Sequence, residues 1–338
     1  MAGARAGLGD DTGRPLPVAV DAMGGDRAPG EIVAGARRAA EELGIPVVLV
    51  GPPDQVGDTG GLEVLPASEV ISMDEDPAQG VRRKKDSSLV RAAEAVRDGR
   101  ALAMVSAGNT GAAMASALLR MGRLKGIVRP AIATPIPQLG SHPTVLLDAG
   151  ANAECTPPML VQFAQMGSAY STARYGVEEP SVALLSIGEE KSKGTTLVKE
   201  THALLSATPG LRFVGNAEGR DLMHDAPDVV VTDGFTGNVA LKTLEGSLRF
   251  FMDTLLDVLS KTEETKKASE ALLPYLAPLA AEFDPDNTGG AVLLGVDGVC
   301  VISHGSSSAQ AIVSAVRVAH DVATGGLVDR LAHAVTQA

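Results

Sequence analysis

Short apolar runs rich in β-branched residues alternate along the chain with longer amphipathic stretches. The short runs predict β-strands, because Val and Ile suit a buried pleated surface and polar turn residues bound most runs. The strands are expected at residues 18–21, 47–50, 101–106, 144–148, 182–187, 211–214, 229–232 and 299–302. The longer stretches carry apolar residues three and four apart, which predicts helices at residues 29–43, 88–97, 112–121, 158–175, 195–205 and 306–322. This alternation predicts one α/β unit over residues 17–338, with a mostly parallel sheet covered by helices.

Residues 244–285 break this rhythm with a long, mostly helical stretch. It contains the apolar groups Phe250-Phe251 and Leu272-Leu273, but its apolar runs are too short to cross a bilayer. Residues 261–267 are too polar to be buried on all sides. We therefore expect a projecting helical segment that contacts a second copy of the chain, a membrane surface or both; a pair of core helices is the alternative.

Composition narrows the classes of function. The 29 Lys and Arg against 41 Asp and Glu give a net charge of −12, and 3% aromatic residues without Trp do not favour nucleic-acid binding. Cys155 and Cys300 stand far apart outside any C-x-x-C pattern, which argues against disulfides or structural zinc. Residues 1–16 lack the apolar run of a secretory signal, so we expect a disordered tail and a cytoplasmic protein.

Small polar residues follow at least five of the predicted strands. These junctions are residues 21–26, 106–111, 188–190, 233–238 and 304–308. In a parallel sheet such loops gather at one edge, where helix N-termini offer N–H donors to an anion. Each loop alone is equally explained by turns and helix capping, but their number favours an anion or phosphate site. Residues 108–111 and 234–237 also echo each other, through either internal duplication or chance.

Standard signatures of other enzymes fail on inspection. The run from Gly188 to Thr195 has Lys193 before Gly194, the reverse of a phosphate-binding loop, and no G-x-G-x-x-G follows the first strand. Residues 305–309 fall short of a nucleophile elbow because Ala309 replaces its last Gly. Cys155 is a possible nucleophile, although a buried small thiol is the commoner role.

The motifs taken together resemble bacterial acyl-ACP:phosphate acyltransferases. The resemblance rests on residues 18–29, 105–112, 129–131, 147–152, 162–167, 188–190, 193–194, 233–238 and 304–307. It covers nearly the whole chain after the tail; Ala149 stands where Val is usual, and the tail is longer than the family needs. It implies a three-layer α/β/α fold like that of isocitrate and isopropylmalate dehydrogenases, a homodimer, acyl carrier protein as acyl donor and association with the membrane surface. It also implies a relation to phosphate acetyl- and butyryltransferases.

For that reaction we expect direct attack by phosphate, because phosphate is already ionised and a thioester has a good leaving group. Placement and charge stabilisation are then the enzyme's task, with no cofactor and no metal. The catalytic candidates are His304, Lys193 and Asp233, although His304 is equally suited to a structural hydrogen bond. The substrate-binding candidates are Asp21, Gly24, Gly25, Lys85, Ser87, Asn109, Thr110, Gly111, Asn152, Glu189, Thr236, Gly237, Asn238 and Ser306.

An acidic carrier protein needs a local cationic face on this acidic chain. The docking candidates are Arg82, Arg83, Arg120, Arg123 and Lys125, beside Lys84, Lys85 and Arg129. The other expected partners are inorganic phosphate, a second copy of the chain, and the inner membrane face or a membrane glycerol-phosphate acyltransferase. Three alternatives stay open: a short-chain enzyme using acyl-CoA, a nicotinamide-dependent decarboxylating dehydrogenase, and a non-enzymatic membrane-surface scaffold.

Overall fold

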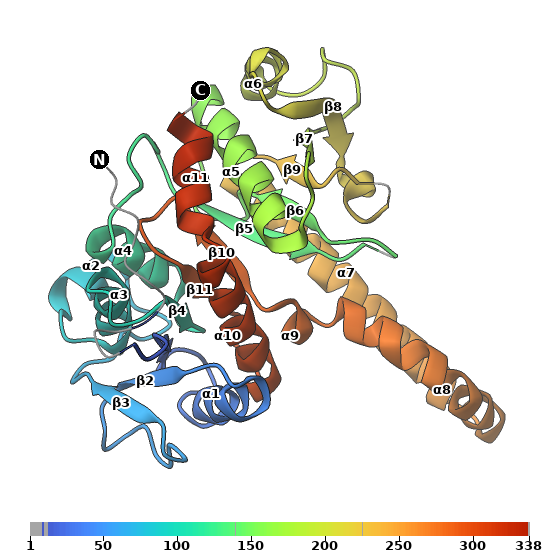
Figure 1. Ribbon diagram of the computed structural model, residues 1–338. Coiled ribbons are helices and arrows are strands. Elements are labelled where there is room, and N and C mark those ends of the chain that lie inside the picture. Colours follow the sequence, from blue (N-terminus) through green and yellow to red (C-terminus); the bar gives the residue numbers. More distant parts are fainter. Residues whose placement is uncertain (1–8, 10–12, 139, 225, 337–338) are drawn as a thin grey trace.

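A computed structural model describes residues 9, 13–138, 140–224 and 226–336 (Figure 1). Most of the tail expected at residues 1–16 lies outside the described residues. The described part of the chain forms an 11-stranded sheet in the order β3-β2-β1-β4-β11-β10-β5-β6-β9-β7-β8. Its strands are β1 (Val18–Asp21), β2 (Val47–Gly51), β3 (Glu63–Pro66), β4 (Ala103–Ser106), β5 (Ala131–Ile136), β6 (Thr144–Leu147), β7 (Ser181–Ser186), β8 (Arg212–Glu218), β9 (Val229–Val231), β10 (Ala291–Leu294) and β11 (Cys300–Ile302).

The sheet reverses direction at its centre. Strands β3, β2, β1, β4 and β11 are mutually parallel, as are β6, β9, β7 and β8. Between these sets, β10 is antiparallel to both β11 and β5, and β5 is antiparallel to β6. Mostly parallel pairing is therefore confirmed. The expectation that all the loops share one edge is wrong, because the two parallel sets end at opposite edges.

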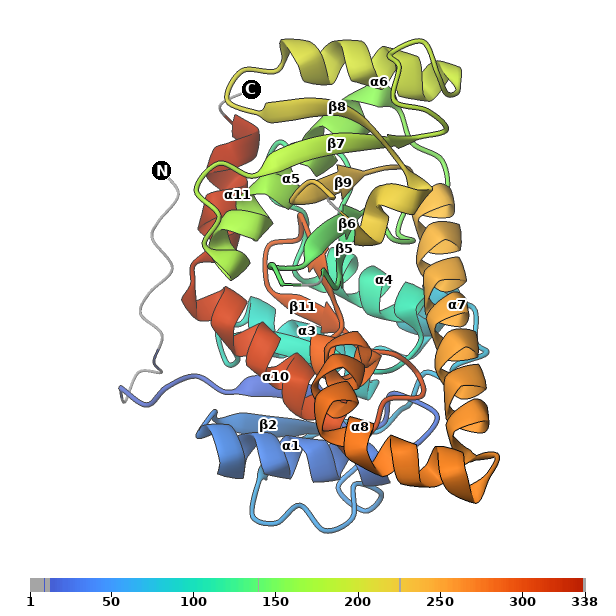
Figure 2. The ribbon, with the colours of Figure 1, turned by 90° about the vertical axis from the view of Figure 1, so that its right-hand side faces the viewer.

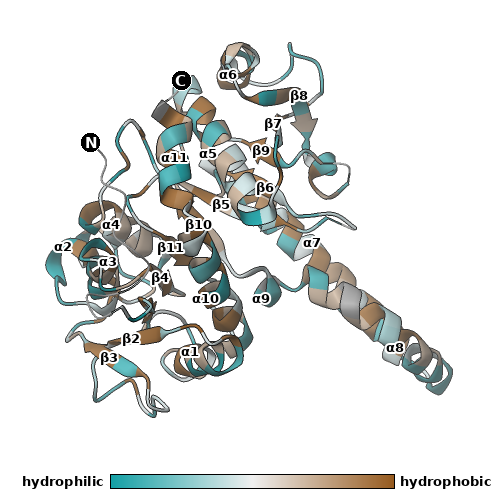
Figure 3. Cartoon of the chain, viewed as in Figure 1, coloured by the Kyte–Doolittle hydropathy of each residue, from teal (hydrophilic) through white to brown (hydrophobic). Residues whose placement is uncertain are grey.

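Helices cover both faces of the sheet, which confirms the three-layer architecture. One face is covered by α1 (Gly30–Leu43), α5 (Pro157–Tyr175), α6 (Thr196–Ala207), α10 (Ala309–Thr324) and α11 (Leu327–Thr336). The other is covered by α2 (Pro77–Arg83), α3 (Ser88–Arg97) and α4 (Thr110–Arg120). Successive residues of one strand enter different cores: Val18 and Val20 join the first, whereas Ala19 joins the second. The hydropathic view shows the apolar strands between these layers (Figure 3).

A helical hairpin projects from the body (Figures 1 and 2). Helix α7 (Gly234–Ser260) and α8 (Glu263–Phe283) pack together, and the short α9 (Pro285–Thr288) follows them. The helical part begins ten residues before the predicted segment, because Asp233 caps α7 at the end of β9. Phe250, Phe251 and Tyr275 are exposed on the hairpin, by 74%, 62% and 79% respectively.

No single helix among the described residues is both long and apolar enough to cross a membrane. Within the described part of the chain, one helix pair, Ala309–Thr324 and Leu327–Val335, reaches that length and composition when its two parts are taken together, but it is bent by 58°.

Candidate functional site

Asp21 lies at the end of β1 and accepts hydrogen bonds from two loops, the one that follows β1 and the one that follows β4. It is 2% exposed, and its carboxylate accepts hydrogen bonds from Ser106 Oγ at 2.7 Å and from the Met23 amide at 3.3 Å. Burial raises the pKa of Asp21 above its usual range, while hydrogen bonds with Ser88 and Ser106 act in the opposite direction. The carboxylate therefore stabilises the conformation of the surrounding loops and is not accessible to solvent.

Loops 21–26, 106–111 and 304–308 meet in what we call the first loop cluster. A Cβ on Gly24 would lie 2.7 Å from the Gly108 nitrogen, so this approach requires glycine. Gly25 lies beside Ala107, and the Asp26 amide donates to the Gly305 carbonyl at 2.8 Å. The structure thus brings together the ends of β1, β4 and β11, which are neighbours in the sheet.

Asn109 caps helix α4 at this cluster. Its Oδ1 accepts from the Ala112 amide at 3.0 Å, and its Nδ2 donates to the Met73 carbonyl at 2.8 Å. Thr110 is exposed in the first helical turn, and Gly111 packs against Pro77. Both polar atoms of the Asn109 side chain thus have hydrogen-bond partners within the protein. The exposed first turn of α4 is the part of this loop that can bind an anion.

Ser87 and Lys85 lie farther from these loops along the chain. Ser87 is fully buried and caps α3 through the Val90 amide at 3.4 Å, whereas Lys85 is exposed. The neighbouring Lys84, in contrast to the exposed Lys85, is held in place: its ammonium pairs with Glu75 at 2.6 Å and donates to the Val70 carbonyl at 2.7 Å.

His304 contacts a lysine that the sequence analysis did not single out. Its Nδ1 lies 3.0 Å from Ser306 Oγ, and its Nε2 lies 3.2 Å from Lys242 Nζ on α7. Lys242 also pairs with Glu245 at 2.8 Å. The only signal in the sequence was the position of Lys242 one helical turn beyond Asn238.

A second loop cluster surrounds Asp148, at the end of β6. Asp148 is fully buried; its carboxylate accepts from the amides of Ile132, Gly150, Ala151 and Asn152 at 2.8–3.2 Å and from Asn152 Nδ2 at 2.8 Å. Burial raises the pKa of Asp148, and these hydrogen bonds oppose that shift. Asp148 lay within a family motif but was not predicted as a site residue.

The start of α7 completes this second cluster, which comprises residues 148–152 and 232–238. The Gly234 amide donates to the Asn152 carbonyl at 2.8 Å, and Asn238 Nδ2 donates to the Ala149 carbonyl at 3.2 Å. The Asp233 carboxylate accepts from both the amide and the hydroxyl of Thr236 at 2.8 Å. Asp233 is therefore a helix cap, as Asn109 is at the start of α4.

Lys193 and Glu189 belong to the loop that follows β7. Asn216 Nδ2 donates to the carbonyls of Gly188 and Glu190 at 3.2 and 3.1 Å, which anchors that loop, while the side chains of Glu189 and Lys193 are exposed. Since β7 is parallel to β9, this loop leaves the sheet at the same edge as the second cluster.

Helix α7, whose course is seen in Figure 2, contacts both clusters through Asn238 and Lys242. Asn238, at the second cluster, and Lys242, at the first, are four residues apart and so share one helical face, about 6 Å apart along the axis. The central strands β10 and β11 contain four and three residues, so the opposite edges of the sheet are only about 10–13 Å apart there. Loops at two edges can thus serve one site beside α7.

The predicted docking residues form two separate groups. Arg82 and Arg83 are exposed at the end of α2. In the other group, Arg120 lies 3.8 Å from Glu94, Arg123 donates to the Val128 carbonyl, and Lys125 is exposed. A surface cavity of about 560 Å³ in this second group is lined by Leu118, Arg123, Val128 and Arg129.

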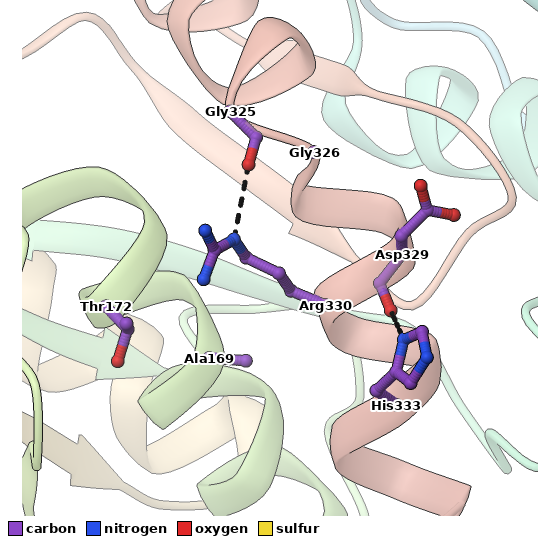
Figure 4. A pocket seen from close by; sticks show the side chains of 7 residues that line it. All are labelled: Ala169, Thr172, Gly325, Gly326, Asp329, Arg330 and His333. Carbon is purple, nitrogen blue, oxygen red and sulfur yellow. Dashed lines mark hydrogen bonds between the residues drawn. The ribbon is translucent and has the colours of Figure 1, made fainter. Parts of the chain in front are cut away.

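A further cavity of about 550 Å³ lies between α5 and α11 (Figure 4). Its lining includes Thr172 and two basic residues, Arg330 and His333, and Arg330 donates to the Gly325 carbonyl at 3.2 Å. None of the predicted site residues lines this cavity.

Comparisons with known proteins agree with the family resemblance. A family model described as fatty acid synthesis protein matches residues 16–330. A phosphate acyltransferase of Nostoc punctiforme is 47% identical over 322 residues, covering 93% of this chain and 95% of that protein. One of Heliobacterium modesticaldum is 49% identical over 313 residues, covering 90% and 93%.

Solved structures share the fold at low sequence identity. EutD phosphotransacetylase from Staphylococcus aureus has a TM-score of 0.58 at 15% identity, with 92% of this chain and 94% of that chain covered. A 4-hydroxythreonine-4-phosphate dehydrogenase from Klebsiella pneumoniae has a TM-score of 0.53 at 13% identity, with 91% and 99% covered. The predicted dehydrogenase-like α/β/α fold is confirmed.

Proposed function

Because the chain belongs to the phosphate acyltransferase family and is an acyltransferase, we propose that it transfers a long-chain acyl group from acyl carrier protein to inorganic phosphate. The product is an acyl phosphate for phospholipid synthesis. The observation that carries this proposal is the first loop cluster, which contains the exposed N-terminal end of α4 and His304, with Lys242 in contact with His304. Helix N-termini and an ammonium are suited to a phosphate anion.

The atoms, charge and proton of the proposed acyl transfer are all accounted for without an external acid. An oxygen of HPO4²⁻ forms a bond to the thioester carbonyl carbon, the C–S bond breaks and its electron pair leaves with sulfur. The proton of the hydrogen phosphate ends on that sulfur, which gives the dianionic acyl phosphate and the free thiol of the carrier.

The protein's task in this step is to place the reactants and to offset negative charge. Phosphate binds among the loop amides near Asn109-Thr110-Gly111 and Thr236-Gly237-Asn238, with Lys193 as a second cation. Asp233 acts indirectly, since its carboxylate fixes the first turn of α7.

The cavity beside Arg123 and Arg129 supports carrier docking at that face. Carrier proteins are acidic and this chain has a net charge of −12, so a local basic rim must overcome general repulsion. Exposed Val128 lies between these arginines and offers an apolar contact. Arg82 and Arg83 form the second candidate face.

The projecting hairpin supports two further contacts. Its exposed aromatic residues suit a homodimer interface and contact with the inner membrane face or a membrane glycerol-phosphate acyltransferase. The proposed location is thus cytoplasmic and peripheral to the membrane.

The donor decides between this proposal and its nearest rival. The purified chain is given phosphate with either long-chain acyl carrier protein or acetyl- and butyryl-CoA, and acyl phosphate is trapped with hydroxylamine. Hydroxamate formed preferentially from the carrier-bound donor supports the proposal. Preference for short-chain CoA would favour the rival, which has a specific basis in the fold shared with a phosphotransacetylase.

A further inference from the structure

The ammonium of Lys242 is held from two sides. It donates to Glu245 Oε2 at 2.8 Å, one helical turn farther along α7, and to His304 Nε2 at 3.2 Å, across the first loop cluster. An ammonium carries three N–H groups, so one is left without a partner among the described residues. The Lys242 side chain is 47% exposed, which leaves that N–H accessible to a ligand.

The same contact determines which nitrogen of His304 carries the ring proton. An ammonium can only donate, so Nε2 must accept, and a neutral imidazole that accepts at Nε2 has its proton on Nδ1. That Nδ1–H can donate to Ser306 Oγ, 3.0 Å away, in place of accepting the longer contact from the Ser306 amide at 3.5 Å. In this arrangement His304 presents no proton at Nε2, and Lys242 is the donor at this end of the cluster.

We propose that Lys242 is a cation that contacts phosphate during acyl transfer, together with Lys193, and that His304 is the positioning residue that holds Lys242 there. The inference rests on the proposed function. Lys242 transfers no proton in this role, so the balance of the reaction is unchanged: the charge of its ammonium offsets that of the phosphate as the nucleophilic oxygen approaches the carbonyl carbon. A compact ammonium beside the loop cluster that contains the start of α4 is suited to this role.

The test separates phosphate from the acyl donor. Lys242→Met is expected to raise KM for phosphate by about 10- to 100-fold, as for loss of a charged hydrogen bond, while KM for acyl carrier protein stays within about twofold. Lys242→Arg keeps the charge and should recover part of the phosphate affinity. An unchanged phosphate KM in Lys242→Met would overturn the proposal.

Arg38 provides a matched control. On α1 it bridges Glu42 at 2.7 Å and Gln310 Oε1 at 2.9 Å, much as Lys242 bridges Glu245 and His304, but outside both loop clusters. Arg38→Met should leave both KM values unchanged. Equal effects of Arg38→Met and Lys242→Met on phosphate KM would mean that a general loss of charge, not a phosphate contact, was measured.

The positioning role of His304 is tested by what replaces it. His304→Gln retains an oxygen that can accept from Lys242, whereas His304→Leu does not, so we expect the phosphate KM to rise more in the leucine variant. The Lys242→Met/His304→Leu double variant should be no worse than Lys242→Met alone, because both act on one contact. Equal losses in His304→Gln and His304→Leu would instead assign His304 a direct proton-transfer role.

Direct binding keeps this inference distinct from the proposed function. Inorganic phosphate alone is titrated into the parent chain and into Lys242→Met, followed by ³¹P NMR, with thermal unfolding as a check of folding. Weaker binding in the variant supports the contact even if the parent forms no acyl phosphate, an outcome that would refute only the proposed function. Equal binding, or none by the parent, overturns the role of Lys242.

Discussion

The carbonyl oxygen of Asp148 occupies the space that a β-carbon on Gly237 would need. Asp148 ends β6 and Gly237 lies in the first turn of α7, so this contact sets how closely α7 approaches the sheet. Both α7 and the loop after β6 are fixed by backbone atoms here, which cannot rotate away as a side chain can. The approach of Asn238 and Lys242 to their partners depends on this packing.

Gly237→Ala should therefore destabilise the protein by at least about 1–3 kcal/mol, the usual cost of forcing extra volume into a packed site. Gly246→Ala, farther along the same helix with nothing within 4 Å of the new carbon, should be neutral or stabilising by up to about 1 kcal/mol. Urea unfolding of the two variants makes the comparison. Equal stability of the two would show that α7 can shift freely.

The buried carboxyl group of Asp21 should make the free energy of unfolding of the protein depend on pH. Its pKa is raised in the folded state by burial, so the folded protein binds this proton more tightly than the unfolded chain, whose pKa is about 3.9. The stability that this group contributes is present at low pH and is lost as the pH rises from the unfolded pKa through the raised folded pKa. The unfolding free energy of the parent minus that of Asp21→Asn should thus fall as pH increases from about 4 and then level off.

Chemical unfolding of both proteins between about pH 4 and pH 8 measures this difference. The raised pKa of Asp148 gives the same trend in both chains and cancels on subtraction. A difference that increases with pH would mean that hydrogen bonds from Ser106 and Ser88 outweigh burial at Asp21.

The accuracy of the strand predictions depends on the residues within and beside each strand. Strand β1 agrees with its prediction at both ends because Val18 to Val20 are completely buried and polar loop residues follow. Strand β5 was missed because Pro135 lies inside it, and β10 because glycines at 289, 290 and 295 bound its short run. These two strands reverse the sheet, so missing them produced the mistaken single edge.

Part of the candidate site could be predicted from the sequence and part could not. Glycine-rich loops are visible in the sequence because few other residues tolerate such close backbone approach, as at Gly24. Lys242 was not visible, because an exposed lysine on an amphipathic helix has the pattern of ordinary solvated surface. Only the path of α7 across the central strands brings it to His304.

Lys193 should affect turnover far more than its neighbour in the same loop. Lys193→Ala is expected to lower kcat/KM by about tenfold or more, the effect of losing one charged hydrogen bond to phosphate. Lys191→Ala removes an equally exposed lysine two residues earlier and should stay within about twofold of the parent. Steady-state hydroxamate assays compare them, and similar values would remove Lys193 from the proposed site.

The two basic faces can be tested separately for carrier docking. Arg82→Glu/Arg83→Glu and Lys125→Glu/Arg129→Glu each reverse two exposed charges. Reversal at the true docking face should raise KM for acyl carrier protein by about 5- to 30-fold, since each lost surface pair is worth about 0.5–1 kcal/mol, and the effect should shrink at high salt. The KM for phosphate should not change. If neither double variant alters the carrier KM, docking occurs elsewhere.

A Cys155 variant can show whether the acyl group passes directly to phosphate or first to a cysteine of the protein. The Cys155 thiol lies next to the second loop cluster, with Sγ 3.6 Å from the Asn152 carbonyl, but burial and the nearby Asp148 and Asp233 raise its pKa to about 11. A thiol that stays protonated near neutral pH is a poor nucleophile. Cys155→Ala should therefore keep near-parental turnover, and mass spectrometry of the parent mixed with acyl carrier protein should detect no thioester on Cys155. Loss of turnover together with an acylated Cys155 would replace direct attack by phosphate with a two-step mechanism.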